Sequence, residues 1–380
     1  MRRKSTNIKA SVEVKEKSEI IHCVDLFCGV GGLTHGLIKG GINVLAGIDI
    51  DSQCRFAYEA NNKSIFIEKD INQITGNDLE KIFGNSKFRL LAGCAPCQPF
   101  SSYSRKSNRV NRDTKWELIS AFSRLVKETK PDFVTMENVP QLLDHQVFQD
   151  FLRDLKDYSI SFRVIECVHY GVPQTRRRLV LIASQLGNID ILPPSFFDYD
   201  DNTTVQKAIS HLPKINAGDS DLNDPLHSAS SLSDLNLLRI QSSKPGGSWR
   251  DWDKSLLAQC HRKKSGQTYP SVYGRMTWNE PSPTITTQCF GYGNGRFGHP
   301  EQDRAISLRE AAILQTFPED YCFLAPNEKV RFAKLGRLIG NAVPVRLGEV
   351  IAQSFIVHLK EMESSQISTN PEVLTDRKEE

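Results

Sequence analysis

The stretch IIHCVDLFCGVGGLTHGLIKGG, residues 20–41, begins as a short apolar run, turns through closely spaced glycines and continues with helical spacing. Glycines directly after a strand let the backbone approach a ligand closely at the N-terminus of the following helix. Gly29 and Gly31 would need a third glycine at position 34 to complete a dinucleotide-binding fingerprint, and the sequence has Thr34 there. The stretch therefore predicts a strand, a ligand-binding turn and a helix, without a dinucleotide fingerprint.

Alternating strands and helices continue along the chain as far as Ser184. The apolar runs that predict strands are NVLAGIDI (43–50), FRLLAG (88–93), DFVTMEN (132–138) and RRLVLIAS (177–184), and the predicted helices are SQCRFAYEANN (52–62) and ELISAFSRLVKET (117–129). Short strands separated by helical segments of about ten residues are typical of βαβ units and a parallel sheet. We therefore predict an α/β fold with a doubly wound, mostly parallel sheet.

The sequence changes character after Ser184. Residues 187–300 are rich in Pro, Gly, Ser, Asn and Asp and have no sustained period, which predicts a second, smaller and irregular domain. Helical spacing returns in SLREAAILQTF (307–317) and after GNAVP (340–344), where we expect a helix that returns to the first domain. The predicted divisions are a disordered N-terminus (1–18), the α/β domain (19–186), the irregular domain (187–300), a hinge and C-terminal helix (301–360) and a disordered tail (361–380).

Composition narrows the class of protein. The 380 residues are 39% hydrophobic and 24% charged, and they contain no run of about twenty apolar residues, so we expect no membrane partner. The polar N-terminus lacks the apolar stretch of a secretory signal, which predicts a cytoplasmic protein. Nine scattered cysteines favour reduced thiols, and no second Cys or His pair completes a zinc site, so we expect no metal.

Two acidic residues lie where a nucleoside-type ligand would need them. Asp49 ends the second predicted strand, 20 residues after Gly29, where a carboxylate can accept hydrogen bonds from two ribose hydroxyls. Asp70, near the end of the next strand, can similarly receive an adenine amino group. The alternative is a glycine-rich turn with ordinary surface acids.

The segment GCAPCQPFS, residues 93–101, follows the strand FRLLAG directly. A cysteine thiolate is a strong nucleophile, and a site that lowers its pKa activates it further. Three interpretations remain open at this point: a buried structural cysteine, a redox pair formed by Cys94 and Cys97, or a catalytic nucleophile.

Two further groups lie at predicted strand ends. Glu137 lies near the end of the strand DFVTMEN, and the arginine triplet 176–178 lies at the start of the last strand. Alone, a glutamate is usually a solvated cap and an arginine triplet a basic surface. At the carboxyl ends of neighbouring parallel strands, however, they would converge with the cysteine segment on the crevice where such sheets bind ligands.

The chain resembles the DNA cytosine-5 methyltransferases, especially those of bacterial restriction-modification systems, because its segments follow the order of that family. They are DLFCGVGG (25–32), GIDID (47–51), KDI (69–71), APCQPFS (95–101), ENVP (137–140), QTRRRL (174–179), PTITT (283–287), SLREAAILQTFP (307–318) and GNAVP (340–344). Together they span residues 24–350, and the ordered set is far more specific than any one segment. The resemblance implies the Rossmann-like fold of S-adenosylmethionine-dependent methyltransferases.

The resemblance also implies S-adenosylmethionine as the cofactor, together with the residues that hold it. The predicted cofactor-binding residues are Phe27, Gly29, Gly31 and Gly32 around the ligand, Asp49 and Ile50 at the ribose, Asp70 and Ile71 at the adenine, and Leu118, Asn341 and Ala342 closing over it. The pair Ile50 and Asp51 replaces an aromatic residue often present beside the ribose acid, so we expect weaker stacking on the adenine.

For catalysis, the resemblance implies that Cys97 attacks carbon 6 of cytosine, which activates carbon 5 for methylation. Glu137 would bind N3 and the exocyclic amine, Arg178 would bind O2, and Arg176 would order the site. Cys94 would be a bystander.

The implied substrate is double-stranded DNA, from which the target cytosine must be flipped. The basic segment 101–115 after Cys97, with Ser101 and Arg105, is a predicted DNA-closing lid, and residues 187–300 are the predicted target-recognition domain. The other predicted DNA contacts are Arg262, Lys263, Lys264 and Thr284. We expect a monomer, and the family type makes a cognate restriction endonuclease a candidate partner.

Three rival functions remain. A tRNA cytosine-5 methyltransferase would share the catalytic segments but would need little recognition domain. A thiol oxidoreductase would require both Cys94 and Cys97. A DNA-binding module without activity is disfavoured because Cys97, Glu137 and Arg178 are all present.

Overall fold

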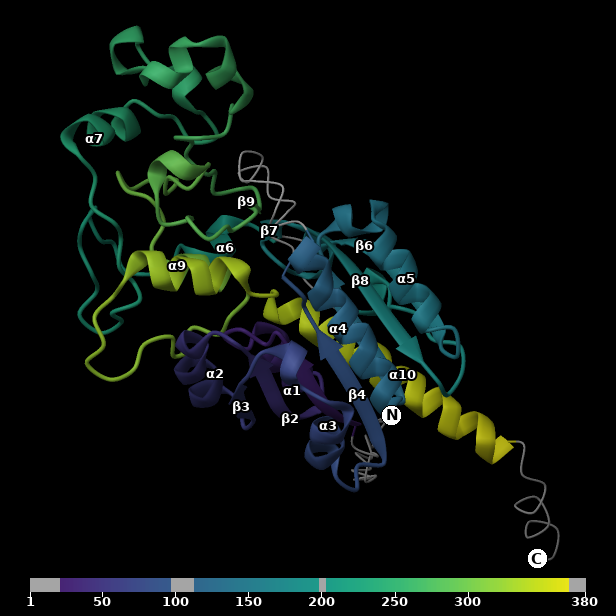
Figure 1. The fold of residues 1–380 in the computed structure, drawn as a ribbon. Helices are drawn as coiled ribbons and strands as arrows, with labels where there is room; N and C mark the ends of the chain where they lie inside the picture. The colour runs from purple at the N-terminus through teal and green to yellow at the C-terminus, as the bar shows by residue number, and fades with distance from the viewer. Residues whose placement is uncertain (1–20, 97–112, 198–202, 369–380) are drawn as a thin grey trace, which may run out of the picture.

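The computed structural model describes residues 21–96, 113–197 and 203–368, and it contains a seven-stranded sheet with strand order β3-β2-β1-β4-β5-β8-β6 (Figure 1). The strands are β1 (Ile21–Leu26), β2 (Asn43–Asp49), β3 (Ile65–Glu68), β4 (Phe88–Gly93), β5 (Phe133–Asn138), β6 (Ser159–Glu166) and β8 (Arg177–Ser184). A separate small sheet pairs β7 (Gln174–Thr175) with β9 (Ser282–Pro283). The predicted α/β fold with a mostly parallel sheet is confirmed.

The strand order reverses at β1, which is parallel both to β2 on one side and to β4 on the other. The loops after β1 and β4 therefore leave the same edge of the sheet, where open α/β sheets bind ligands. The backbone joins the two loops directly, because the Cys94 N–H donates a hydrogen bond to the Leu26 carbonyl at 3.3 Å. The glycine turn and the cysteine segment are thus neighbours.

The direction of β8 differs from the prediction that this strand continues the parallel series. It lies antiparallel to both β5 and β6. Strand β6 was not predicted from the sequence, because it is the outermost strand of the sheet and only its residue Ile165 is fully buried. As a result the start of β8 lies beside the end of β5, with Glu137 opposite Val180. The antiparallel direction brings Glu137 and the arginine triplet together.

Helices cover both faces of the sheet (Figure 1). One face carries α1 (Gly32–Lys39) and α10 (Val345–Ser368), and the other carries α3 (Gly76–Phe83), α4 (Asp113–Thr129) and α5 (Gln146–Asp154). Successive side chains of a strand point to opposite faces, so Leu90 and Ala92 pack with α1 and α10 while Leu91 packs with α3 and α4. The C-terminal helix α10 therefore packs beside α1 against one face of this sheet.

Glycines let α1 and α10 touch through their backbones. A Cβ atom on Gly36 would lie 2.1 Å from the Val345 carbonyl oxygen, and one on Gly40 would lie 2.3 Å from the Ala352 Cβ.

The helical stretch Phe332–Ser364 is long and apolar enough to cross a membrane, but 72% of its most apolar window is buried inside the molecule. This burial identifies it as part of the core.

The C-terminal helix also corrects one predicted boundary. Helix α10 runs to Ser368, whereas the sequence predicted a disordered tail from residue 361. Met362 gives the extra turns a packing partner, because its sulfur would lie 3.1 Å from a Cβ atom placed on Gly187. Contact with the sheet domain thus continues the helix beyond its regular apolar pattern.

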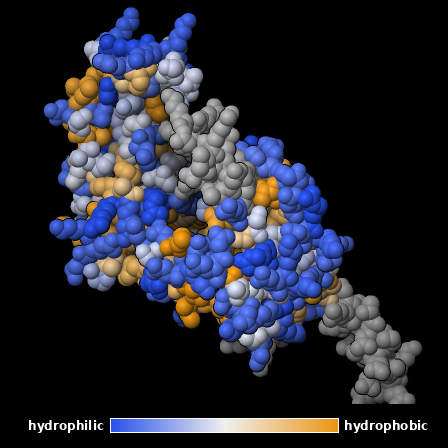
Figure 2. Space-filling view, viewed as in Figure 1, coloured by the Kyte–Doolittle hydropathy of each residue, from blue (hydrophilic) through white to orange (hydrophobic). Residues whose placement is uncertain are grey.

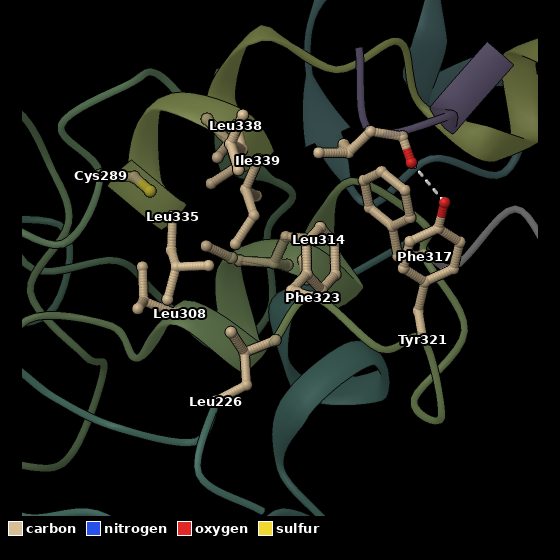
Figure 3. Packing of buried hydrophobic residues seen from close by; sticks show 14 of the residues in the cluster. Leu226, Cys289, Leu308, Leu314, Phe317, Tyr321, Phe323, Leu335, Leu338 and Ile339 are labelled. Atoms are coloured by element: carbon tan, nitrogen blue, oxygen red, sulfur yellow. Dashed lines mark hydrogen bonds between the residues drawn. The ribbon is translucent and has the colours of Figure 1, made fainter. Parts of the chain in front are cut away.

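The part of the chain between β8 and α10, which we call the second lobe, is built from short helices and 3₁₀ turns, as the irregular sequence predicts (Figure 1). The sheet with its covering helices is the first lobe. Its helices are α6 (Val205–Ile209), α7 (Asp234–Gln241), α8 (Leu308–Leu314) and α9 (Phe332–Asn341). Three of these helices, α6, α8 and α9, share one buried cluster with Cys28 and Val30 of the first lobe. The Tyr321 hydroxyl donates a hydrogen bond to the Val30 carbonyl at 2.5 Å. Figure 3 shows the Tyr321 ring beside Phe317 in this cluster. The second lobe therefore packs directly against the turn after β1, where α2 (Arg55–Asn61) completes the contact.

Farther out, the second lobe has an aromatic core of its own. Trp249 stacks on His261 with ring centroids 4.2 Å apart, and Trp252, Tyr273 and Tyr292 pack around them.

The surface is mostly hydrophilic, with a hydrophobic patch over α7 in Figure 2. Exposed leucines of α7 account for that patch: Leu235, Leu237 and Leu238.

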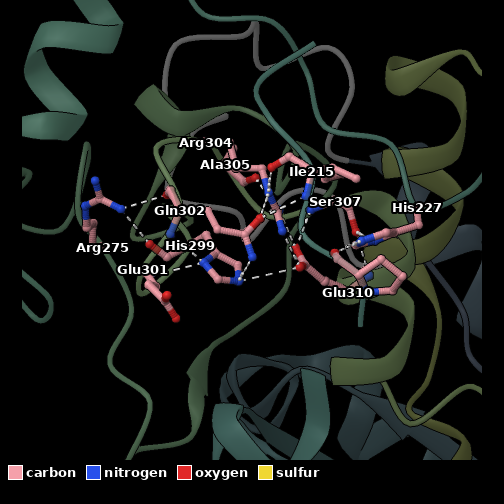
Figure 4. Close-up of polar contacts among 11 residues, drawn as sticks. Ile215, His227, Arg275, His299, Glu301, Gln302, Arg304, Ala305, Ser307 and Glu310 are labelled. Atoms are coloured by element: carbon pink, nitrogen blue, oxygen red, sulfur yellow. Dashed lines mark hydrogen bonds and ion pairs between the residues drawn. The ribbon is translucent and has the colours of Figure 1, made fainter. Parts of the chain in front are cut away.

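A buried polar cluster lies at the start of α8, within the second lobe (Figure 4). Arg304 and Glu310 are both fully buried and form two hydrogen bonds of 2.7 Å. Glu310 also accepts the Ser307 N–H, which begins α8 with a capping box. His299 lies 3.7 Å from Glu310, and burial lowers the pKa of His299 to about 4.

Candidate active site

The turn after β1 has the strained backbone that its glycines predict. Gly29 and Gly31 have positive φ angles of 52° and 87°, and Phe27 adopts a φ of 59° although it carries a side chain. A Cβ atom on Gly29 would meet nothing within 4 Å, whereas one on Gly31 would lie 2.6 Å from Asn62 Nδ2. Gly31 is therefore needed for packing, and Gly29 leaves open space beside the backbone.

The GNAVP segment lies against this turn. A Cβ atom on Gly32 would lie 2.3 Å from the Val343 carbonyl and 3.4 Å from the Ala342 Cβ. Asn341 is the exposed last residue of α9. The structure thus brings the predicted cofactor residues Asn341 and Ala342, far apart from Gly32 in sequence, to the same turn.

Asp49 at the end of β2 is tied to the glycine turn. Its two carboxylate oxygens accept the Gly29 and Asp51 N–H groups, both at 2.9 Å. Burial raises the pKa of Asp49 above its ordinary value, while these backbone donors act in the opposite direction. The next side chain, Ile50, is 68% exposed, so it is available to contact a ligand beside the carboxylate.

The remaining predicted cofactor residues follow β3 and begin the α4 region. Asp70 accepts the Asn72 N–H at 2.9 Å, and the neighbouring Lys69 N–H donates to the Asp49 carbonyl at 3.1 Å. Ile71 is buried in the same hydrophobic cluster against which the half-buried Leu118 packs. These contacts bring Asp70 and Asp49 to one edge of the sheet.

Asp25 is a buried acid that the sequence reasoning missed. It has no exposed surface, accepts the Thr34 hydroxyl at 2.6 Å, and has a pKa raised to about 7, mainly by burial. Its other oxygen accepts no hydrogen bond from the described residues. An acidic residue inside the apolar run just before the glycines was the available signal.

The end of β5 carries the most concentrated chemistry. Glu137 is only 2% exposed, and Arg178 Nε lies 2.8 Å from its Oε1. This contact is an ion pair without hydrogen-bond geometry, so Oε1 accepts no hydrogen bond from the residues that the structure describes. Cys94 Sγ donates a hydrogen bond to the other oxygen, Oε2, at 2.8 Å. Cys94 therefore contacts Glu137 directly, although the resemblance gave it no role.

Arg176 is buried between the two lobes rather than exposed with its neighbours. Its guanidinium donates to the Ile285 and Ala342 carbonyls at 3.2 and 3.3 Å. Burial and the nearby Arg178 lower the pKa of Arg176 to about 10. Gln174, which the sequence reasoning did not single out, donates to the Leu314 carbonyl at 3.0 Å and joins the same network.

The predicted DNA contacts are not gathered into one place among the described residues. Cys97, Ser101 and Arg105 lie in 97–112, outside the described residues. The exposed basic residues Arg262, Lys263 and Lys264 belong to the outer second lobe, next to the aromatic core. Thr284 lies instead directly after β9, where its hydroxyl donates to the Thr175 carbonyl at 2.7 Å.

Comparison with known sequences gives one family. Residues 21–356 match the family described as C-5 cytosine-specific DNA methylase. The type II methylase M.HgiDII of Herpetosiphon aurantiacus is 53% identical over 336 residues, which cover 87% of this chain and 94% of the relative. The type II methyltransferase M1.HphI of Haemophilus parahaemolyticus is 31% identical over 351 residues, which cover 89% of this chain and 88% of the relative.

Solved structures share the fold. A structure described as a DNA modification methyltransferase encoded within an E. coli prophage matches with a TM-score of 0.69 and 22% identity, over 90% of this chain and 99% of that one. The S. pombe Dnmt2 methyltransferase matches with a TM-score of 0.56 and 16% identity, over 90% of this chain and 99% of that one. At these identities the likeness is one of fold.

Proposed function

The chain belongs to the C-5 cytosine-specific DNA methylases, and we propose that it methylates cytosine with Cys97 as nucleophile and Glu137, Arg176 and Arg178 around the base. As a DNA cytosine-5 methyltransferase of the restriction-modification type, it acts on DNA. The observation that supports the residue roles is the contact of Glu137 with Arg178 at the end of β5. This pair lies on the sheet edge that also carries the glycine turn and Cys94.

The proposed cofactor is S-adenosylmethionine, which supplies an electrophilic methyl group when bound. The open space at Gly29, the carboxylate of Asp49 and the exposed Ile50 fit a ligand with a ribose and an adenine. The residues that would hold it are Phe27, Gly29, Gly31, Gly32, Asp49, Ile50, Asp70, Ile71, Leu118, Asn341 and Ala342. Because the Asp49 carboxylate is already oriented by two backbone N–H groups, it is prepared to accept ribose hydroxyls without rearranging.

The proposed roles follow from the chemistry of cytosine. Carbon 5 is too weakly nucleophilic to be methylated until the Cys97 thiolate forms a bond to carbon 6. Negative charge then develops on the ring, and a protonated Glu137 at N3 neutralises it while Arg178 holds O2. Loss of the carbon-5 proton and departure of the thiolate restore the aromatic ring. Arg176 orders the site by joining the Ile285 and Ala342 backbones.

The target cytosine has to leave the duplex, which costs a few kcal/mol that phosphate contacts can offset. We assign recognition to residues 187–300, with phosphate contacts from Arg262, Lys263 and Lys264 and a lid at 101–115 that includes Ser101 and Arg105. Thr284 is the proposed contact from the β9 region. We further propose a monomer that works in the cytoplasm beside a cognate restriction endonuclease.

A fluorinated duplex tests the nucleophile. When the target cytosine carries fluorine at carbon 5, attack and methylation proceed, but no proton is available for the final elimination. The protein should remain covalently joined to the DNA in a denaturant-stable adduct that forms only with S-adenosylmethionine. Cys97→Ser should abolish the adduct because a hydroxyl supplies almost no anion at neutral pH, whereas Cys94→Ser should still form it.

Two results would contradict the assignment. If Cys94→Ser removes the adduct while Cys97→Ser forms it normally, the assignment of Cys97 as the nucleophile is wrong. If radioactive methyl groups enter tRNA but not duplex DNA, the tRNA alternative replaces the DNA substrate.

A further inference from the structure

Cys94 is the only partner that donates a hydrogen bond to Glu137 among the described residues. Its Sγ reaches Oε2 at 2.8 Å, and its own backbone N–H is held by the Leu26 carbonyl at the end of β1. The thiol thus approaches Glu137 from the end of β4, while Arg178 approaches Oε1 from β8. The two carboxylate oxygens of Glu137 are held by different partners.

We propose that Cys94 is a positioning residue that decides which oxygen of Glu137 carries the proton given to the base. This inference rests on the proposed role of Glu137 at N3 of cytosine. An oxygen that accepts a hydrogen bond is favoured as the carbonyl-like oxygen of a neutral carboxyl group. When Arg178 pairs with O2 of the bound base, the thiol keeps Oε2 as the acceptor, and Oε1 is the oxygen that carries the proton.

This arrangement matches what a cytosine edge requires. N3 is an acceptor and the exocyclic amine a donor, so the two oxygens must have opposite roles. Oε1–H donates to N3, and Oε2 accepts the amine N–H together with the thiol, using its two lone pairs. As the thiolate adds at carbon 6, the Oε1 proton moves to N3, and Glu137 becomes a carboxylate that Cys94 and Arg178 still contact. A carboxyl rotated by half a turn would present acceptor to acceptor.

Kinetics separate positioning from structure. Cys94→Ala should slow single-turnover methylation by roughly 3- to 15-fold, the range expected for one hydrogen bond, while DNA and cofactor affinities change by less than about twofold. Cys94→Ser keeps a donor and should recover most of the rate. Cys23→Ala is the matched control and should leave the rate unchanged. This thiol is buried in β1 and belongs to the hydrophobic cluster against which Cys94 packs.

A double-mutant cycle tests whether Cys94 acts through Glu137. In a Glu137→Ala background, Cys94→Ala should have no further effect on formation of the fluorocytosine adduct. If Cys94→Ala slows the reaction by the same factor in both backgrounds, its effect is structural and the proposal is wrong. If Cys94→Ser is as slow as Cys94→Ala, the donor is not what matters and the proposal is also wrong.

Infrared spectroscopy reads the hydrogen bond without any enzyme activity. The S–H stretch of Cys94 is isolated as the difference between the protein and its Cys94→Ala variant. It should lie at lower frequency when Glu137 is present than in the Glu137→Ala background, because hydrogen bonding weakens the S–H bond. An unchanged frequency overturns the contact itself. Because this measurement needs no methyl transfer, it stands even if the proposed roles at the base fail.

Discussion

Arg304 and Glu310 form two hydrogen bonds of 2.7 Å, and neither side chain is exposed to solvent. Removing one partner of a buried ion pair leaves an uncompensated charge, so Arg304→Met should lower the free energy of unfolding by about 3–5 kcal/mol. Arg304→Met combined with Glu310→Gln should lose less, because no charge is then stranded. Urea denaturation checks this. As a control, Arg55→Met breaks exposed ion pairs and should cost at most about 1 kcal/mol.

His299 should make the second lobe sensitive to acid. Burial lowers its pKa from 6.5 to about 4, so below pH 6.5 the unfolded chain takes up a proton that the folded chain refuses until about pH 4. Stability is therefore lost as the pH falls through this window, by roughly 2–4 kcal/mol. His299→Gln should flatten the pH dependence there. The separate loss between about 4.5 and 2, where Glu310 with its pKa of about 2 is protonated, should remain. An unchanged curve in the variant would refute the assignment.

Asp25 should have the opposite effect. Its pKa is raised from 3.8 to about 7 by burial, so the folded chain holds a proton in this window that the unfolded chain has lost. Stability then falls as the pH rises from about 4 to 7. Asp25→Asn stays neutral and should be more stable than the natural protein at pH 8, with little difference near pH 4. Thermal denaturation at both values decides, and a larger gain at pH 4 would contradict the mechanism.

Asp49 should determine cofactor affinity. Asp49→Ala removes the proposed ribose acceptor and also releases the Gly29 N–H, so S-adenosylmethionine binding should weaken by roughly 1–3 kcal/mol. DNA affinity without cofactor should barely change. Glu59→Ala, on the exposed face of α2, is the calorimetric control and should bind the cofactor normally. Equal affinity of Asp49→Ala and the natural protein would remove Asp49 from the site.

The basic residues of the outer second lobe should contact phosphates. Changing Arg262, Lys263 and Lys264 to Gln should weaken DNA binding and flatten its dependence on salt by about one unit of slope for each lost contact. The same change at Lys127 on α4, Arg153 on α5 and Lys156 just after α5 keeps the total charge equal and should have no such effect. If both triple variants show the slope of the natural protein, DNA binds elsewhere.

The sequence predicted the first lobe well because its signals are local. An apolar run followed by glycines identified β1 and its turn, and the strand that carries Glu137 near its end was placed correctly. The direction of β8 was wrong because an apolar run looks the same in either direction, and strand direction depends on pairing with β5 and β6. The convergence of Glu137 with Arg178 was expected, but antiparallel pairing is what produces it.

Contacts between distant segments could not be predicted. Nothing local distinguishes Arg176 from Arg178, yet one is buried against Ile285 and Ala342 while the other faces Glu137. The hydrogen bond from Cys94, directly after β4, to Glu137 in β5 likewise depends on side-chain geometry that residue spacing does not predict. The order of the sequence segments was enough to predict which chemical groups belong to the site. The contacts that each group makes depend on tertiary packing.

The contact of the glycine turn with GNAVP has a consequence for how the protein is made. Gly32 and Gly36 pack against the carbonyls of Val343 and Val345, more than 300 residues later in the chain. On the ribosome, the first βα unit emerges early but lacks these neighbours until residues 343–345 have also been made. Cofactor capture by stalled nascent chains of increasing length would therefore begin only after these last segments leave the exit tunnel.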